Sequence, residues 1–131
     1  YMDNADALKD FRVLVVDDSN TIRTSAQVFL RQAGCVVTLA ETGYDALAVI
    51  EEAKPQLIFL DILMPRLDGY QTCTLLKSNP EYRDIPIVML SSKDGLFDQA
   101  RGQLAGANEY MTKPFARDDL LKVVESYAAQ K

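Results

Sequence analysis

Residues 13–19 read VLVVDDS, four apolar residues followed at once by two acidic residues and a serine. Two more apolar runs occur further along the chain, LIFL at 57–60 and IVML at 87–90. None of them alternates apolar with polar residues, as a strand with one face in water would. Each run therefore predicts a parallel strand that is covered on both faces. Weaker strand signals lie at 36–40 and 109–112.

Helical periodicity fills the segments between these strands. After the first strand, Ser19 is a suitable helix N-cap and Gly34 a suitable stop. Four further helices are expected at 43–53, 69–78, 95–105 and 116–129. Alternation of strands and helices predicts an α/β fold with helices on both faces of an open sheet. Five strands suit the flavodoxin-like (βα)5 doubly wound sandwich, whose parallel five-stranded sheet has the order 2-1-3-4-5.

The length of 131 residues suits one domain. Residues 1–10 are polar and are expected to form a flexible leader, with Tyr1 as an addition before a native Met2, so that 11–131 form the folded domain. No apolar run approaches the roughly 18 residues of a membrane span, and no signal-peptide core precedes the first strand. Membrane insertion is therefore not expected.

The composition excludes several classes of function. The chain has no histidine, which removes Ser-His-Asp and Cys-His catalysis as well as histidine-ligated metal sites. The net charge of −5 argues against nucleic acid as the main partner, because phosphate binding needs clustered lysine and arginine. Cys35 and Cys73 match no metal or redox spacing and are expected to be buried hydrophobes in a reducing, cytoplasmic compartment.

Polar residues follow four of the predicted strands. They are Asp17-Asp18, Asp61, Ser91 and Lys113, and the carboxyl ends of parallel strands meet at one edge of the sheet. Clustered carboxylates repel one another unless a cation joins them, and Mg²⁺ (or Mn²⁺) prefers such oxygen ligands. With a lysine and a hydroxyl, these groups suit phosphoryl transfer onto a carboxylate, and Asp61 is the expected nucleophile because its strand is central.

These residues make the chain resemble the receiver domain of bacterial two-component response regulators. The resemblance rests on VLVVDDS at 13–19, FLDILMPRLDGY at 59–70, MLSS at 89–92 and YMTKPF at 110–115, and it covers residues 12–129. It implies that Asp61 accepts a phosphoryl group from a phosphohistidine. It also implies that Asp18 binds Mg²⁺ directly, that Asp17 acts mostly through water, and that the backbone carbonyl of Leu63 is a further ligand.

The resemblance assigns roles to the other polar residues as well. Ser91 would be the switch hydroxyl, Tyr110 the aromatic side chain that follows it, and Lys113 the lysine that pairs with phosphate. The bond before Pro114 is expected to be cis, which proline permits at low cost. Gly69 is expected to relieve backbone strain in the turn that follows the acceptor.

The resemblance also implies partners. A sensor histidine kinase or phosphotransfer protein would donate the phosphoryl group, and a downstream protein would read the surface of 95–105, 109–112 and 116–129. Candidate output residues on that surface are Phe97, Arg101, Tyr110 and Lys122. MPRLDGYQTC at 64–73 and SSKDGLFDQARG at 91–102 resemble the stand-alone, chemotaxis-type receivers of type IV pilus systems, so pilus machinery or its regulators are the implied target. The protein is expected to be a monomer or a weak phosphorylation-linked dimer.

Three other functions compete with this interpretation. A flavin carrier of the same fold must cradle phosphate after the first strand, where Asp17-Asp18 would repel it. An aspartyl-phosphate hydrolase of the haloacid-dehalogenase type resembles the site but needs a D-x-D pattern there, whereas these acids are adjacent. A receiver-like module that binds partners without phosphorylation is the third. The favoured interpretation is a phosphoacceptor signalling protein that catalyses only its own phosphoryl transfer and dephosphorylation.

Overall fold

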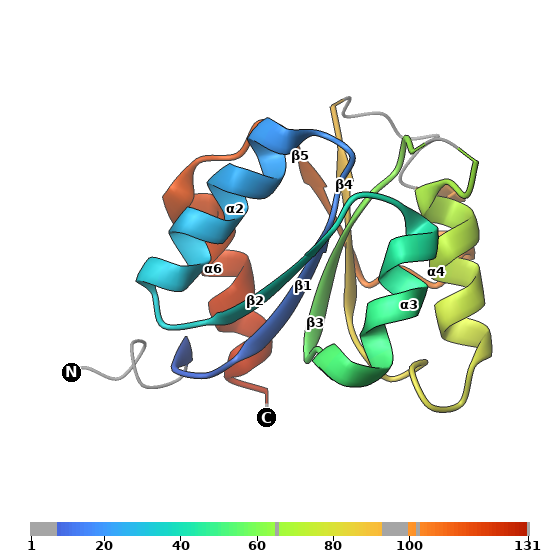
Figure 1. The fold of residues 1–131 in the computed structure, drawn as a ribbon, viewed down its shortest axis with the longest axis horizontal. Helices are drawn as coiled ribbons and strands as arrows, with labels where there is room; N and C mark the ends of the chain where they lie inside the picture. The colour runs from blue at the N-terminus through green and yellow to red at the C-terminus, as the bar shows by residue number, and fades with distance from the viewer. Residues whose placement is uncertain (1–7, 65, 93–99, 102, 131) are drawn as a thin grey trace.

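A computed structural model describes residues 8–64, 66–92, 100, 101 and 103–130 of the chain. The elements in these residues are β1 (Arg12–Val16), α2 (Asn20–Gln32), β2 (Val36–Ala40), α3 (Gly43–Ala53), β3 (Leu57–Asp61), α4 (Gly69–Ser78), β4 (Ile87–Ser91), β5 (Glu109–Thr112) and α6 (Arg117–Ala128). Their labels are those of Figure 1.

The five strands form one parallel sheet in the order β2-β1-β3-β4-β5. The predicted flavodoxin-like order is therefore confirmed. The order of the strands reverses beside β1, so β1 and β3 are neighbours although β2 lies between them in sequence. The edge between β1 and β3 is the topological switch point, where sites form in sheets of this kind.

Helices cover both faces of the sheet, with α2 and α6 on one face and α3 and α4 on the other (Figure 1). Successive side chains of a strand point to opposite faces, so Val13 and Val15 join the core against α2 and α6, whereas Leu14 and Val16 join the core against α3 and α4. All four side chains are at most 1% exposed. Burial on both sides explains why the run is apolar without alternation.

Local hydrogen bonds fix where the helices begin. The Ser19 hydroxyl accepts from the backbone N–H of Ile22 and caps α2, as the sequence predicts. Asp68 caps α4 by accepting from the N–H of Gln71, whose side chain accepts from the N–H of Asp68 in return. This capping box fixes the start of α4 directly after the loop that follows Asp61.

One residue of the predicted flexible leader is part of the folded core. Leu8, which falls within the predicted leader, is 2% exposed and packs in the core against α2 and α6. The N–H of Asp10 donates to the carbonyl of Gly34, which holds this segment against the end of α2.

The helix predicted at 95–105 is described only in part. Residues 100, 101, 103 and 104 are helical, and 93–99 and 102 lie outside the described residues. Among the described helices, none is long and apolar enough to span a membrane.

Both cysteines are expected to be inert in the folded protein. Cys35 is 6% exposed and Cys73 is 0% exposed, and burial raises the pKa of each thiol from 9.0 to about 11. The thiolate is the reactive form, so its fraction at pH 8 should fall about a hundredfold relative to an ordinary thiol and rise again only toward pH 11. Titration with Ellman's reagent at pH 8 should label neither thiol in buffer and both in urea. Rapid labelling of the native protein would contradict the burial.

Candidate functional site

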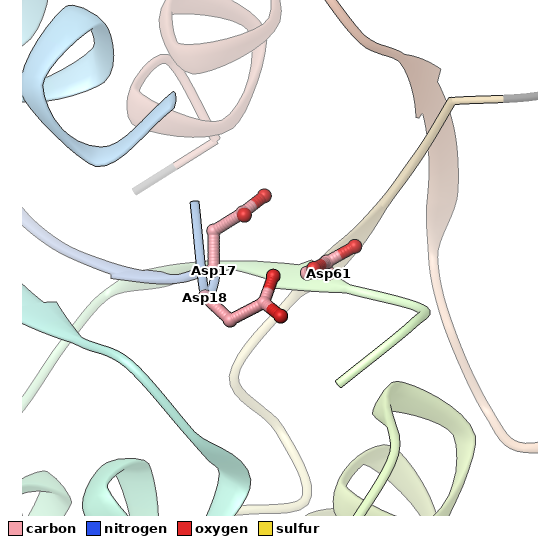
Figure 2. A group of neighbouring side chains, drawn as sticks. All are labelled: Asp17, Asp18 and Asp61. Atoms are coloured by element: carbon pink, nitrogen blue, oxygen red, sulfur yellow. The ribbon is translucent and has the colours of Figure 1, made fainter. Parts of the chain in front are cut away.

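Three carboxylates gather at the carboxyl edge of the sheet (Figure 2). Asp17 and Asp18 follow β1 directly, and Asp61 is the last residue of β3. Each carboxylate offers an oxygen that lies within 4.8 Å of the others. The register explains the meeting, because Val16 pairs with Leu60 and the acids come next on both strands. Parallel pairing thus brings together residues more than forty positions apart.

The buried carboxylate of Asp17 accepts a hydrogen bond at each of its two oxygens. Its Oδ1 accepts from the backbone N–H of Ser19 at 2.8 Å, and its Oδ2 accepts from Lys113 Nζ at 2.9 Å. The side chain of Asp17 is 0% exposed, so both bonds lie in a region of low dielectric where they are strong. Asp17 is therefore a fixed anion that anchors the lysine beside the other acids.

Asp61 is also buried, with 2% exposure. Its Oδ1 accepts from Lys113 Nζ at 3.0 Å and from the N–H of Leu63 at 3.3 Å. Burial raises the pKa of Asp61 from 3.8 to about 6; the bond to Lys113 opposes this rise, and the charge of Asp17 and a hydrogen bond with Asp18 add to it. A carboxylate with a raised pKa is more basic and so a better nucleophile while still ionised above pH 6.

Lys113 joins the two buried acids. Lys113 directly follows β5, and its backbone N–H donates to the carbonyl of Ser91 at 2.7 Å. Burial lowers the pKa of Lys113, but the hydrogen bonds and charges of Asp17 and Asp61 outweigh it and raise the pKa overall. The side chain therefore stays positively charged at neutral pH. The peptide bond between Lys113 and Pro114 is cis.

The predicted switch residues lie on β4, the strand next to that of Asp61, and on β5, the strand beyond it. Ser91 ends β4 directly after Leu90, the register partner of Asp61, and is 7% exposed. Tyr110 pairs in register with Met89 and packs, partly buried, against the core on the α3 and α4 face. The structure thus places Ser91 at the end of the strand beside β3 and Tyr110 on the next strand, β5.

The predicted output residues that the structure describes lie on elements around the β5 edge of the sheet. The Arg101 guanidinium lies 4.3 Å from the ring centroid of Tyr70, so it stacks against α4. Lys122 is exposed on α6. Phe97 lies outside the described residues. Arg101 and Lys122 therefore belong to elements on opposite faces of the sheet, with β5 at the edge between them.

The role predicted for Gly69, relief of backbone strain, is wrong. Its backbone does not adopt the left-handed conformation that favours glycine, so strain relief is not its function. A Cβ added at Gly69 would instead overlap the carbonyl oxygen of Asp61 and lie 2.8 Å from Cα of Ile62. Gly69 is required because α4 starts directly against the backbone of Asp61 and Ile62. The side chain of Leu63 is 71% exposed, and its N–H binds the Asp61 carboxylate.

Arg23 is a site residue that the sequence analysis missed. Its Nη1 donates to the backbone carbonyl of Asp17 at 2.7 Å, and its Nη2 donates to Asn20 and Glu41 at 3.3 and 3.2 Å. An arginine in the first turn of a helix that follows an acid pair is a weak signal. Side-chain direction, which the sequence does not give, decides its contact.

The donor set fits a hard divalent cation. Asp17, Asp18 and Asp61 supply only oxygen ligands, and one of the three carboxylates is exposed to admit water and substrate. Mg²⁺ is commonly held by a few carboxylates and keeps several waters. Lys113 balances one of the three negative charges, which leaves the group anionic and suited to a cation.

Comparison with known proteins gives consistent matches along the chain. A sequence model of the response regulator receiver domain matches residues 13–125. PilG of Pseudomonas aeruginosa is 51% identical over 116 residues, which cover 88% of this chain and 86% of PilG. The response regulator MprA of Mycobacterium ulcerans is 41% identical over 110 residues, 84% of this chain but 47% of MprA. The solved chemotaxis protein CheY4 of Vibrio cholerae superposes with a TM-score of 0.84 at 32% identity, covering 88% of this chain and 96% of CheY4.

Proposed function

This chain belongs to the response regulator receiver family, and we propose on that basis that Asp61 accepts a phosphoryl group from a kinase or phosphotransfer protein. The observation that carries the proposal is the pairing of a buried Asp61 with Lys113, beside Asp17 and Asp18. A buried carboxylate with a lysine and two further acids has little structural purpose and suits charge-balanced chemistry.

The proposed step is a displacement at phosphorus. An oxygen of the Asp61 carboxylate bonds to phosphorus while the phosphorus–nitrogen bond of the donor's phosphohistidine breaks, and the imidazole leaves with the electron pair and takes a proton. Asp17, Asp18, Asp61 and the Leu63 carbonyl would hold Mg²⁺, which when bound neutralises charge on the phosphoryl oxygens. Lys113 then pairs with a phosphoryl oxygen in place of the Asp61 oxygen that is now bonded to phosphorus in the acyl phosphate.

The proposed signal is a change of surface. The Ser91 hydroxyl turns to donate to the new phosphoryl group, and Tyr110 on the neighbouring strand moves with it. The surface of β5, α6 and residues 100–105, which carries Arg101 and Lys122, then binds a downstream protein differently. The likeness to PilG supports a role in pilus motility or chemotaxis, with pilus machinery or its regulators as the target. The free thiols support a cytoplasmic location.

Intact-mass measurement tests the proposed function. The wild-type protein with acetyl phosphate and Mg²⁺ should gain one phosphoryl group, because the site itself supplies the groups that the transfer needs. The gain should disappear when EDTA removes the metal and return when Mg²⁺ is added back. If neither small donors nor a phosphorylated phosphotransfer protein modify the chain, the phosphorylation-independent binding module is the better interpretation.

A further inference from the structure

Arg23 is almost buried, although it lies near the protein surface. Its side chain is 12% exposed, and it makes three hydrogen bonds that link the end of β1, the first turn of α2 and the loop after β2. The shortest, 2.7 Å, goes to the backbone carbonyl of Asp17 and not to a carboxylate of the acidic site. A largely buried guanidinium that binds a backbone carbonyl beside three acids points to a role in the arrangement of those acids.

That carbonyl belongs to the peptide unit that joins Asp17 to Asp18. Every other polar group of Asp17 has its own partner, since its N–H donates to the carbonyl of Ala40 and its carboxylate accepts from Ser19 and Lys113. The Asp18 side chain is exposed and follows directly. Because a peptide unit is planar, fixing its oxygen also fixes the direction in which Asp18 leaves the strand.

We infer that Arg23 is a positioning residue for the cation site: by binding the Asp17 carbonyl, it orients Asp18 toward Asp61. This inference rests on the proposed function, in which Asp18 is a metal ligand. Asn20 and Glu41 hold the guanidinium in place. The ion pair with Glu41 contributes little, because the Glu41 side chain is 66% exposed. Hydrogen bonds one shell beyond a metal orient its ligands in this way.

The positive charge of Arg23 and its role in orientation predict opposite changes in Mg²⁺ affinity when the residue is replaced. Removing a positive charge beside three carboxylates should, by Coulomb attraction alone, make the site bind Mg²⁺ more tightly. Loss of orientation should make the site bind Mg²⁺ less tightly, by about tenfold, which is typical when a residue that orients a metal ligand is removed. The two effects oppose each other, so the direction of the change tells positioning from charge.

The test is calorimetric titration of the full chain with Mg²⁺ alone, well below the melting temperature. Arg23→Met should weaken binding about tenfold, whereas Glu41→Gln should change it less than twofold. Lys77→Met is the matched control: Lys77 Nζ also donates to backbone carbonyls, those of Arg83 and Ile85, but at the opposite edge of the sheet. It should lower stability and leave Mg²⁺ affinity unchanged.

The outcomes separate the inference from the proposed function. If wild type does not bind Mg²⁺, the metal site itself is refuted. If wild type binds and Arg23→Met binds as tightly or more tightly, Arg23 does not position Asp18. Should Arg23→Met fail to fold, Arg23→Lys replaces it: the charge is kept, but one ammonium does not reproduce the planar fork, so binding should still weaken. Wild-type affinity in Arg23→Lys would then overturn the inference.

Discussion

Replacing Asp61 with asparagine is expected to abolish phosphoryl acceptance while leaving the fold intact. An amide does not attack phosphorus as a carboxylate does, so no acyl phosphate forms. The amide oxygen keeps the shape of the side chain and accepts from the N–H of Leu63, as Asp61 does now. With acetyl phosphate and Mg²⁺, intact-mass analysis should therefore show no gain, and the circular dichroism spectrum should match that of wild type.

The same substitution at another aspartate, Asp45, is the control. Asp45 lies in the first turn of α3, is exposed, and takes no part in the acidic group of Asp17, Asp18 and Asp61. Asp45→Asn should gain one phosphoryl group at the wild-type rate. A mass gain that persists in Asp61→Asn would place the acceptor at another residue, and a gain lost in both variants would point to a general defect of the preparations.

The sequence predicts the acidic site because its geometry follows from backbone topology. Unbroken apolar runs indicate parallel strands, and parallel strands put the residues that follow them at one edge. That rule alone brings Asp17, Asp61, Ser91 and Lys113 together, and the structure places Lys113 Nζ within 3.0 Å of both buried acids. No side-chain detail is needed to foresee this meeting.

Features that depend on side-chain direction or on local space are not predictable in the same way. Arg23 has several rotamers, and only packing selects the one that reaches the Asp17 carbonyl. Leu8 lies in a polar stretch whose composition suggests a loose leader, yet it is 2% exposed against the core. Gly69 is visible in the sequence as a turn residue, but its reason is the closeness of another backbone.

Replacing Gly69 with alanine is expected to damage both stability and phosphoryl acceptance. Intrinsic helix propensity favours alanine over glycine by about 1 kcal/mol. The added Cβ, however, would overlap the carbonyl oxygen of Asp61 and crowd Cα of Ile62, and both are backbone atoms that do not rotate away. Overpacking of this kind typically costs about 1–3 kcal/mol, so the net effect should be a loss of stability.

The substitution should also affect phosphorylation, because the overlapped atom belongs to Asp61, the proposed acceptor. Moving the Asp61 carbonyl shifts its carboxylate away from Lys113 and the N–H of Leu63, so phosphorylation should slow by about a hundredfold. Gly106→Ala is the control: it strains a backbone with φ of 101° and presses on the flexible Lys77 side chain, remote from Asp61. It should lower the melting temperature and leave the phosphorylation rate unchanged. Wild-type stability and rate in Gly69→Ala would show that α4 can move outward without disturbing the acceptor.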